Sequence, residues 1–286
     1  MDSETASTAA TSLPLEHDRP NAGFDADSLH IEWSGDQSRP GVVLLHGWGS
    51  SAELMRPIAR SLSDSFRVAN VDLPGHGRSP VPTTSLGVPE HADLVYAMIR
   101  KHFGDPVSIV GHSNGGRIAM YMASDPSMMQ VIDRLVLVGP SGIKPHRTAS
   151  FYVRKYLARG LKAPFEVLPG KFRESGLDWL RHSLLWNLLG SSDYRRLTGV
   201  MRDTFVKTVS TYLDDQVHTI TAPTLIFWGD QDQEIGREQV TSLEQKIPDA
   251  GLVVLPNAGH YAYLDDPITF LRATRFFLEK SDTARS

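Results

Sequence analysis

A tight turn between a buried strand and a helix is the feature that most constrains this chain. Residues 107–116 read Val-Ser-Ile-Val-Gly-His-Ser-Asn-Gly-Gly, an apolar run followed by Gly-x-Ser-x-Gly and the start of a helix near Gly115. Gly111 and Gly115 allow the strand and helix backbones to pass close together, where a Cβ would clash. Such a turn projects the Ser113 hydroxyl above a sheet edge and places the backbone N–H of Asn114 at a helix N-terminus, facing a developing oxyanion. The pattern predicts a nucleophilic serine.

In two earlier segments, an apolar run is also followed by a glycine-rich turn. Residues 42–45 are Val-Val-Leu-Leu and lead into His-Gly-Trp-Gly, which predicts a strand buried on both faces and a loop after it. The backbone N–H of Trp48 in that loop is the expected second oxyanion donor. Asp72 ends the predicted strand Phe66–Asp72, and His76 lies in the loop after it. We interpret both as structural residues whose side chains hold a Gly-rich loop by hydrogen bonds.

The candidate acid and base come late in the chain. The run from Thr224 leads into an acidic turn with Asp230 and Asp232, and the next strand, from Leu252, ends in a loop with His260. The order Ser113, Asp232, His260 is the one expected for a serine, acid and histidine set on an α/β sheet. Asp232 is favoured because it lies beyond the turn, and Asp230 stays open as the alternative. The preceding predicted strand, 134–139, leads into Pro-Ser-Gly-Ile, so the turn after that strand offers no alternative carboxylate.

Together these motifs resemble the α/β-hydrolase superfamily over about residues 31–278. Segments 141–145, 190–194 and 201–207 are further similar to a bacterial subgroup of small α/β hydrolases. The resemblance implies a mostly parallel central sheet with helices on both faces and an inserted helical cap. It also implies that Ser113 attacks an acyl carbon, that His260 carries its proton, and that Asp232 orients His260. No cofactor and no metal are required.

The alternation of strands and helices predicts the domain organisation. Helices are expected at 51–62, 89–103, 115–123, 237–246 and 268–278, within core segments 29–140 and 223–280. Residues 141–222 break the alternation, are rich in aromatic and basic residues, and are predicted to form the cap. Residues 1–28 are expected to be a disordered tail with some order near Phe24, and residues 281–286 a second tail. One strand, Leu29–Trp33, precedes the strand at 42–46, so a reduced sheet edge is expected.

Composition restricts the classes of partner. The net charge of −4 favours neither nucleic acid nor an anionic membrane, and the absence of cysteine excludes disulfides, thiolate catalysis and Cys-ligated zinc. No apolar run approaches the roughly 20 residues that span a bilayer, so no membrane insertion is expected. The N-terminal stretch lacks the pattern of a secretory signal, which predicts a cytoplasmic protein. The oligomeric state is not predictable from these features.

The leading hypothesis is a serine hydrolase acting on a small ester or related acyl compound. Carbon–carbon bond hydrolysis of a vinylogous diketone acid is a second hypothesis, although Asn114 and Tyr261 stand where that branch is expected to carry Met and Trp. A ligand receptor on the same fold is the third. Haloalkane dehalogenase and epoxide hydrolase need an Asp nucleophile where this chain has Ser113. Arg117 is interpreted as a packing or salt-bridge residue.

Overall fold

The computed structural model describes residues 24–145 and 197–279, and within them a single seven-stranded sheet organises the chain. The strands are β1 Ile31–Ser34, β2 Gly41–Leu45, β3 Arg67–Val71, β4 Val107–His112, β5 Ile132–Val138, β6 Thr224–Gly229 and β7 Ala250–Leu255. Their order is β1-β3-β2-β4-β5-β6-β7. β1 pairs antiparallel with β3, and every other pairing is parallel. In the described part of the chain β1 alone precedes β2, as the sequence predicts.

The central strands are apolar throughout because both of their faces are buried. In β2, Val43 and Leu45 belong to one core cluster, whereas Val42 and Leu44 belong to the other. Val43 lies between Ala69 of β3 and Ile109 of β4, so three strands contribute to the same layer at that register. Alternate residues of a strand point to opposite faces, so a continuous apolar run is what a doubly covered parallel sheet requires.

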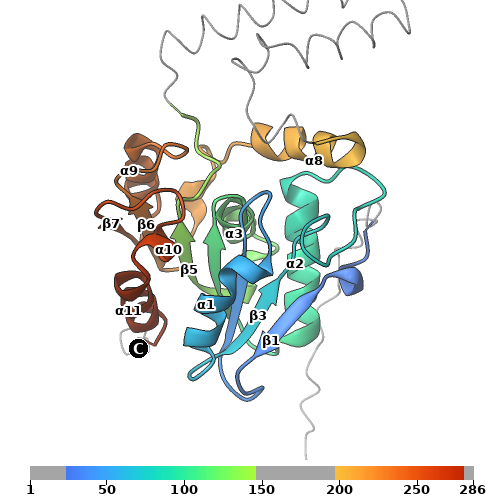
Figure 1. The fold of residues 1–286 in the computed structure, drawn as a ribbon, viewed down its shortest axis with the longest axis horizontal. Helices are drawn as coiled ribbons and strands as arrows, with labels where there is room; N and C mark the ends of the chain where they lie inside the picture. Colours follow the sequence, from blue (N-terminus) through green and yellow to red (C-terminus); the bar gives the residue numbers. More distant parts are fainter. Residues whose placement is uncertain (1–23, 146–196, 280–286) are drawn as a thin grey trace, which may run out of the picture.

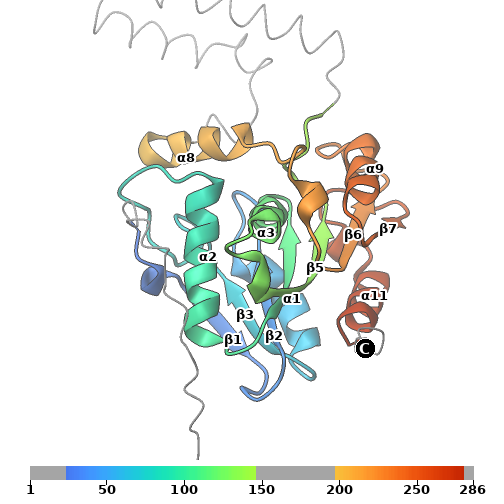
Figure 2. The same ribbon diagram turned by 180° about the vertical axis from the view of Figure 1, so that it is seen from behind.

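Helices cover both faces of the sheet (Figures 1 and 2). One face carries α1 (Ala52–Leu62), the short α10 (Ala262–Asp265) and α11 (Pro267–Glu279). The other carries α2 (Val88–His102), α3 (Asn114–Ser124) and α9 (Arg237–Lys246). Short 3₁₀ turns occur at Met129–Val131 and Val217–Thr219. The predicted fold class is confirmed, and the five predicted helices occur within a residue or two of their expected bounds.

The carboxyl ends of the strands are crossed by helix α8 (Gly199–Ser210), which lies above the sheet in Figure 1. Of the predicted cap at 141–222, residues 146–196 lie outside the described residues. Leu213, Val217 and Ile220 are fully buried in the core cluster that also holds α3 and α9. Residues from Leu213 onward therefore contribute to the core around α3 and α9, although the cap was predicted to extend to residue 222.

The N-terminal tail was predicted at residues 1–28, with some order near Phe24. Residues 1–23 and 280–286 lie outside the described residues, and within 24–28 Phe24 is buried whereas Asp25, Asp27 and Ser28 are exposed. Phe24 is only 7% exposed, and the Asp25 carboxylate accepts a hydrogen bond of 3.0 Å from the backbone N–H of Asp27 in the 3₁₀ turn Ala26–Ser28. Phe24 anchors this segment by joining Leu29 in the core cluster beside α2. None of the helices described is both long and apolar enough to span a bilayer.

Candidate active site

Ser113 occupies a strained turn between β4 and α3. Its φ of 50° and ψ of −108° lie outside the regions that L-residues favour, and non-glycine residues rarely adopt a positive φ. The backbone fixes the turn on both sides. The N–H of Ser113 donates to the Val138 carbonyl at 3.0 Å, and the N–H of Ser141 donates to the Ser113 carbonyl at 3.1 Å. Backbone strain maintained in this way is typical of functional positions.

Two glycines make this turn possible, as the sequence predicts. A Cβ on Gly111 would lie 2.7 Å from the backbone of Gly115 and Gly116. A Cβ on Gly115 would lie 2.1 Å from the Leu45 carbonyl oxygen. Because β2 and β4 are neighbours, this close approach holds the N-terminus of α3 directly against the end of β2.

His260 and Asp232 form a hydrogen-bonded pair from two neighbouring loops. The Nδ1 atom of His260, after β7, lies 2.9 Å from Oδ2 of Asp232, after β6. The Asp232 side chain is 0% exposed and that of His260 is 9% exposed. The other carboxylate oxygen, Oδ1, accepts the backbone N–H groups of Glu234 at 2.8 Å and Ile235 at 3.0 Å. Asp232 is thus held rigidly with one oxygen facing the imidazole.

Asp230, the alternative acid, faces elsewhere. Its Oδ1 accepts the backbone N–H of Asn257 at 2.8 Å and the side-chain amide of Gln231 at 3.2 Å. The residue is exposed. It ties the turn after β6 to the loop after β7, which is a structural role.

The pairing raises the pKa of His260 and lowers the pKa of Asp232, so both side chains favour their charged forms. Burial by itself lowers the pKa of His260, but the hydrogen bond and negative charge of Asp232 outweigh it and raise the pKa above its ordinary 6.5. Burial by itself raises the pKa of Asp232. The hydrogen bonds from His260 and from the backbone N–H groups of Ile235 and Glu234 outweigh that effect and hold the pKa below its ordinary value. The arrangement favours an imidazolium facing a carboxylate.

Ser113 and His260 open into one cavity of about 310 Å³ at the carboxyl ends of the strands, beneath α8. Its lining residues come from the loops after β2, β4, β5, β6 and β7 and from α3 and α8. The candidate oxyanion donors Trp48 and Asn114 also line it. Within the described ranges neither backbone N–H has a hydrogen-bond partner. The structure therefore brings all five predicted site residues to one place.

The loops after β2 and β3 are held by polar side chains, as predicted for Asp72 and His76. The Asp72 carboxylate accepts the backbone N–H groups of Ala52 at 2.6 Å and Arg78 at 2.9 Å. His76 Nδ1 lies 3.0 Å from the Pro74 carbonyl, and its ring packs edge-on against Trp48 at 4.8 Å. Neither side chain lines the Ser113 cavity.

Sequence reasoning missed that His46 fixes the loop carrying Trp48. Its Nε2 accepts the backbone N–H of Leu73 at 3.0 Å, and its Nδ1 therefore donates to the Gly47 carbonyl at 2.7 Å. Burial lowers the pKa of His46 to about 4, so the ring stays neutral and can both accept and donate. A histidine at the end of an apolar strand was the available signal.

Two further residues at the site were also missed. His112 is buried beside Ser113, its Nε2 lies 3.0 Å from the His260 carbonyl, and the two rings are 4.8 Å apart. It therefore positions the His260 loop. Glu234 places a carboxylate oxygen 3.6 Å from His260 Nε2, and its side chain is 67% exposed. The signals were their places, one residue before Ser113 and two after Asp232.

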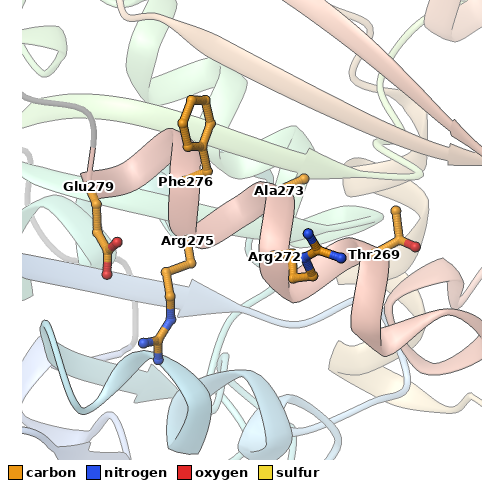
Figure 3. Close-up of a pocket in the computed structure, with 6 residues that line it drawn as sticks. All are labelled: Thr269, Arg272, Ala273, Arg275, Phe276 and Glu279. Carbon is orange, nitrogen blue, oxygen red and sulfur yellow. The ribbon is translucent and has the colours of Figure 1, made fainter.

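A second hollow, of about 580 Å³, lies along α11 (Figure 3). Its described lining side chains all come from that helix: Thr269, Arg272, Ala273, Arg275, Phe276 and Glu279. Arg275 points toward α1 and donates to the Ser61 carbonyl. These residues include no nucleophile beside a base. Among the residues that the structure describes, no group of three His, Asp or Glu side chains is arranged to hold a metal ion.

Comparisons with known proteins point to one family. The family model described as the alpha/beta hydrolase fold matches residues 40–267. The chain is 28% identical over 271 residues to a pimeloyl-[acyl-carrier protein] methyl ester esterase of Chromobacterium violaceum, covering 88% of this chain and 98% of that protein. It is 26% identical over 254 residues to the sn-1-specific diacylglycerol lipase ABHD11 of Danio rerio, covering 83% and 78%.

A solved structure shows the same fold. The enol-lactonase from Burkholderia xenovorans LB400 superposes with a TM-score of 0.66 at 21% identity, covering 88% of this chain and 96% of that one.

Proposed function

The chain belongs to the alpha/beta hydrolase fold family, and we propose that it is a serine hydrolase that cleaves a small carboxylic ester through Ser113, His260 and Asp232. The observation that carries the proposal is the buried 2.9 Å hydrogen bond between His260 and Asp232, beside a cavity that also holds Ser113. Both named relatives cleave esters, according to their names, which supports ester chemistry over other uses of the fold.

In the proposed mechanism, the Ser113 hydroxyl attacks the ester carbonyl and His260 Nε2 takes its proton. Asp232 holds the imidazole in the tautomer with the proton on Nδ1, so that Nε2 is ready to accept. The backbone N–H groups of Trp48 and Asn114 stabilise the negative oxygen of the tetrahedral intermediate. His260 then returns the proton to the leaving alcohol, and an acyl-Ser113 ester remains.

Deacylation repeats these steps with water. His260 Nε2 removes a proton from a water molecule as it attacks the acyl carbon, and the proton returns to Ser113 as the acid leaves. No cofactor enters either half of this sequence. The strained backbone of Ser113 supports the role because it holds the hydroxyl at the cavity in a fixed orientation.

The test is covalent labelling with a fluorophosphonate probe, followed by turnover of p-nitrophenyl esters of increasing chain length. The wild type is expected to be labelled and to release p-nitrophenol, while Ser113→Ala and His260→Ala lose both. Ser124→Ala is the matched control, because Ser124 lies at the far end of the same helix and donates to the Tyr121 carbonyl.

Each outcome has a distinct meaning. Labelling at Ser113 without ester turnover would move the assignment to carbon–carbon bond hydrolysis or to a receptor. An unlabelled wild type, or a wild type labelled at another serine, would overturn the proposal.

A further inference from the structure

One wall of the Ser113 cavity carries a buried positive charge that has no carboxylate partner among the described residues. Arg117 lies on α3, one helical turn after Ser113, and is 6% exposed. Its guanidinium donates to the backbone carbonyl of Thr208 on α8, and its Nε is buried with no hydrogen-bond partner. Within residues 24–145 and 197–279 no acidic side chain forms an ion pair with it. The salt-bridge interpretation of Arg117 is thus wrong for the described residues.

A charge in this position is costly unless something compensates for it. Burial lowers the pKa of Arg117 to about 10, which still leaves the guanidinium protonated at neutral pH. A buried charge is normally paired, because desolvation of an unpaired one costs several kcal/mol. A single carbonyl satisfies only part of a group with five N–H donors. A carboxylate is the planar acceptor that matches the guanidinium geometry.

Two other residues that line the cavity have side chains with no hydrogen-bond partner among the described residues. The side-chain amide of Asn114 is buried with neither its oxygen nor its nitrogen hydrogen-bonded, and the Thr208 hydroxyl is buried without a partner. Both residues line the cavity with Arg117. Buried polar side chains usually find partners, so three unpartnered polar side chains among the residues that line one cavity point to a ligand group that binds there. Together they present N–H and O–H donors around a positive charge.

The remaining lining has a different chemistry. The rings of Trp48 and Phe205 pack at 5.1 Å, and Val209 lies beside them in the lining. Glu234 supplies the one carboxylate among the described lining residues, but it sits at His260 and its side chain is 67% exposed. Solvent therefore screens its repulsion of an anion bound in the cavity.

We propose that the wall formed by Arg117, Asn114 and Thr208 binds a carboxylate of the substrate, so that the ester cleaved at Ser113 is anionic. This inference rests on the proposed function and narrows its substrate class to esters that carry a carboxylate in the acyl or the alcohol part. Arg117 is then a specificity-determining residue, and the apolar rings accommodate the carbon chain between the carboxylate and the ester.

Matched ester pairs test the inference on the wild-type enzyme. Monomethyl glutarate and methyl pentanoate differ only in a carboxylate that replaces a methyl group in the acyl part. Butanoyloxyacetate and ethyl butanoate differ in the same way in the alcohol part. In at least one pair, kcat/KM for the anionic ester is expected to exceed that of the neutral ester by roughly 10-fold or more. Equal values, or a preference for the neutral member in both pairs, would overturn the inference.

Arg117→Met and Arg117→Lys then separate charge from shape. Arg117→Met has a similar length and no charge, so kcat/KM is expected to fall roughly 10- to 100-fold more on the preferred anionic ester than on its neutral partner. Arg117→Lys restores the charge without the planar fork and is expected to recover part of the loss. An equal loss on both esters would show that Arg117 only holds α8 on α3, and would refute the inference.

Binding measurements distinguish failure of this inference from failure of the proposed function. Calorimetry on Ser113→Ala measures the affinity for both esters of the preferred pair without turnover, and the double variant with Arg117→Met tests the contribution of the charge. If the wild type hydrolyses only neutral esters, the inference fails and the proposed function survives. If no ester is hydrolysed but the anionic ester binds Ser113→Ala through Arg117, the proposed function fails and the anion site survives.

Discussion

Replacing Asp232 with Asn tests the role of the acid while leaving the loop in place. Asp232 uses its two oxygens for different tasks: Oδ1 accepts two backbone N–H groups and Oδ2 accepts the imidazole N–H of His260. In Asp232→Asn the amide oxygen must stay on the two backbone donors. The amide nitrogen therefore takes the position of Oδ2 and presents an N–H to Nδ1.

The consequence for His260 follows from hydrogen-bond polarity. Nδ1 can then only accept, so the imidazole proton moves to Nε2, the atom that must receive the proton of Ser113. A wrong tautomer of this kind lowers kcat by roughly 10⁴-fold. That factor corresponds to about 5 kcal/mol of transition-state stabilisation. Because both backbone hydrogen bonds are retained, the melting temperature is expected to fall by no more than a few degrees.

The assay is steady-state turnover of the best p-nitrophenyl ester, with circular dichroism to show that each variant is folded. Asp230→Asn is the matched control, since Asp230 contacts Asn257 and Gln231 and not His260. It is expected to keep kcat within a few-fold of the wild type. If Asp232→Asn retained a tenth of the activity, or if the two variants lost equal amounts, the assignment of Asp232 would be refuted.

The remaining predictions concern pH and packing. The acid limb of the kcat/KM profile is expected above pH 6.5, because the raised pKa of His260 keeps more than half of the imidazole protonated at that pH. Glu234→Gln removes a carboxylate 3.6 Å from His260 Nε2 and therefore lowers the pKa of His260. The acid limb of the profile is expected to move to lower pH by roughly a few tenths of a unit. An acid limb that does not move, measured in low salt, would contradict this reasoning. Gly115→Ala is expected to destabilise the fold by roughly 3 kcal/mol or to prevent folding, because the new Cβ would lie 2.1 Å from the Leu45 carbonyl oxygen. Gly49→Ala, at a φ of 71° with open space around it, is its control and should cost about 1 kcal/mol of backbone strain in chemical denaturation.

Local sequence patterns predicted most of the fold, because the burial of a strand and the close approach of two backbones each restrict which residues can stand at a position. An apolar run such as 42–45 is needed where a strand is covered on both faces, and glycines at 111 and 115 are needed where two backbones nearly touch. Such patterns do not define where the N-terminal tail and the predicted cap segment end. In each segment a single apolar residue, Phe24 or Leu213, packs into the core, and no periodic pattern in the sequence predicts such a contact.

The sequence by itself determined the order of strands and helices, the serine turn, and the set of side chains at the carboxyl ends of the strands. These properties depend on neighbours along the chain. Only the tertiary structure decided that Asp232 rather than Asp230 faces His260, although the two lie in one turn. It also decided that Arg117 is buried on the helix that follows Ser113, with no acidic partner in the part of the chain that the structure describes. The physical reason is that the direction of a side chain and its desolvation depend on loops and helices that meet only after the sheet has assembled.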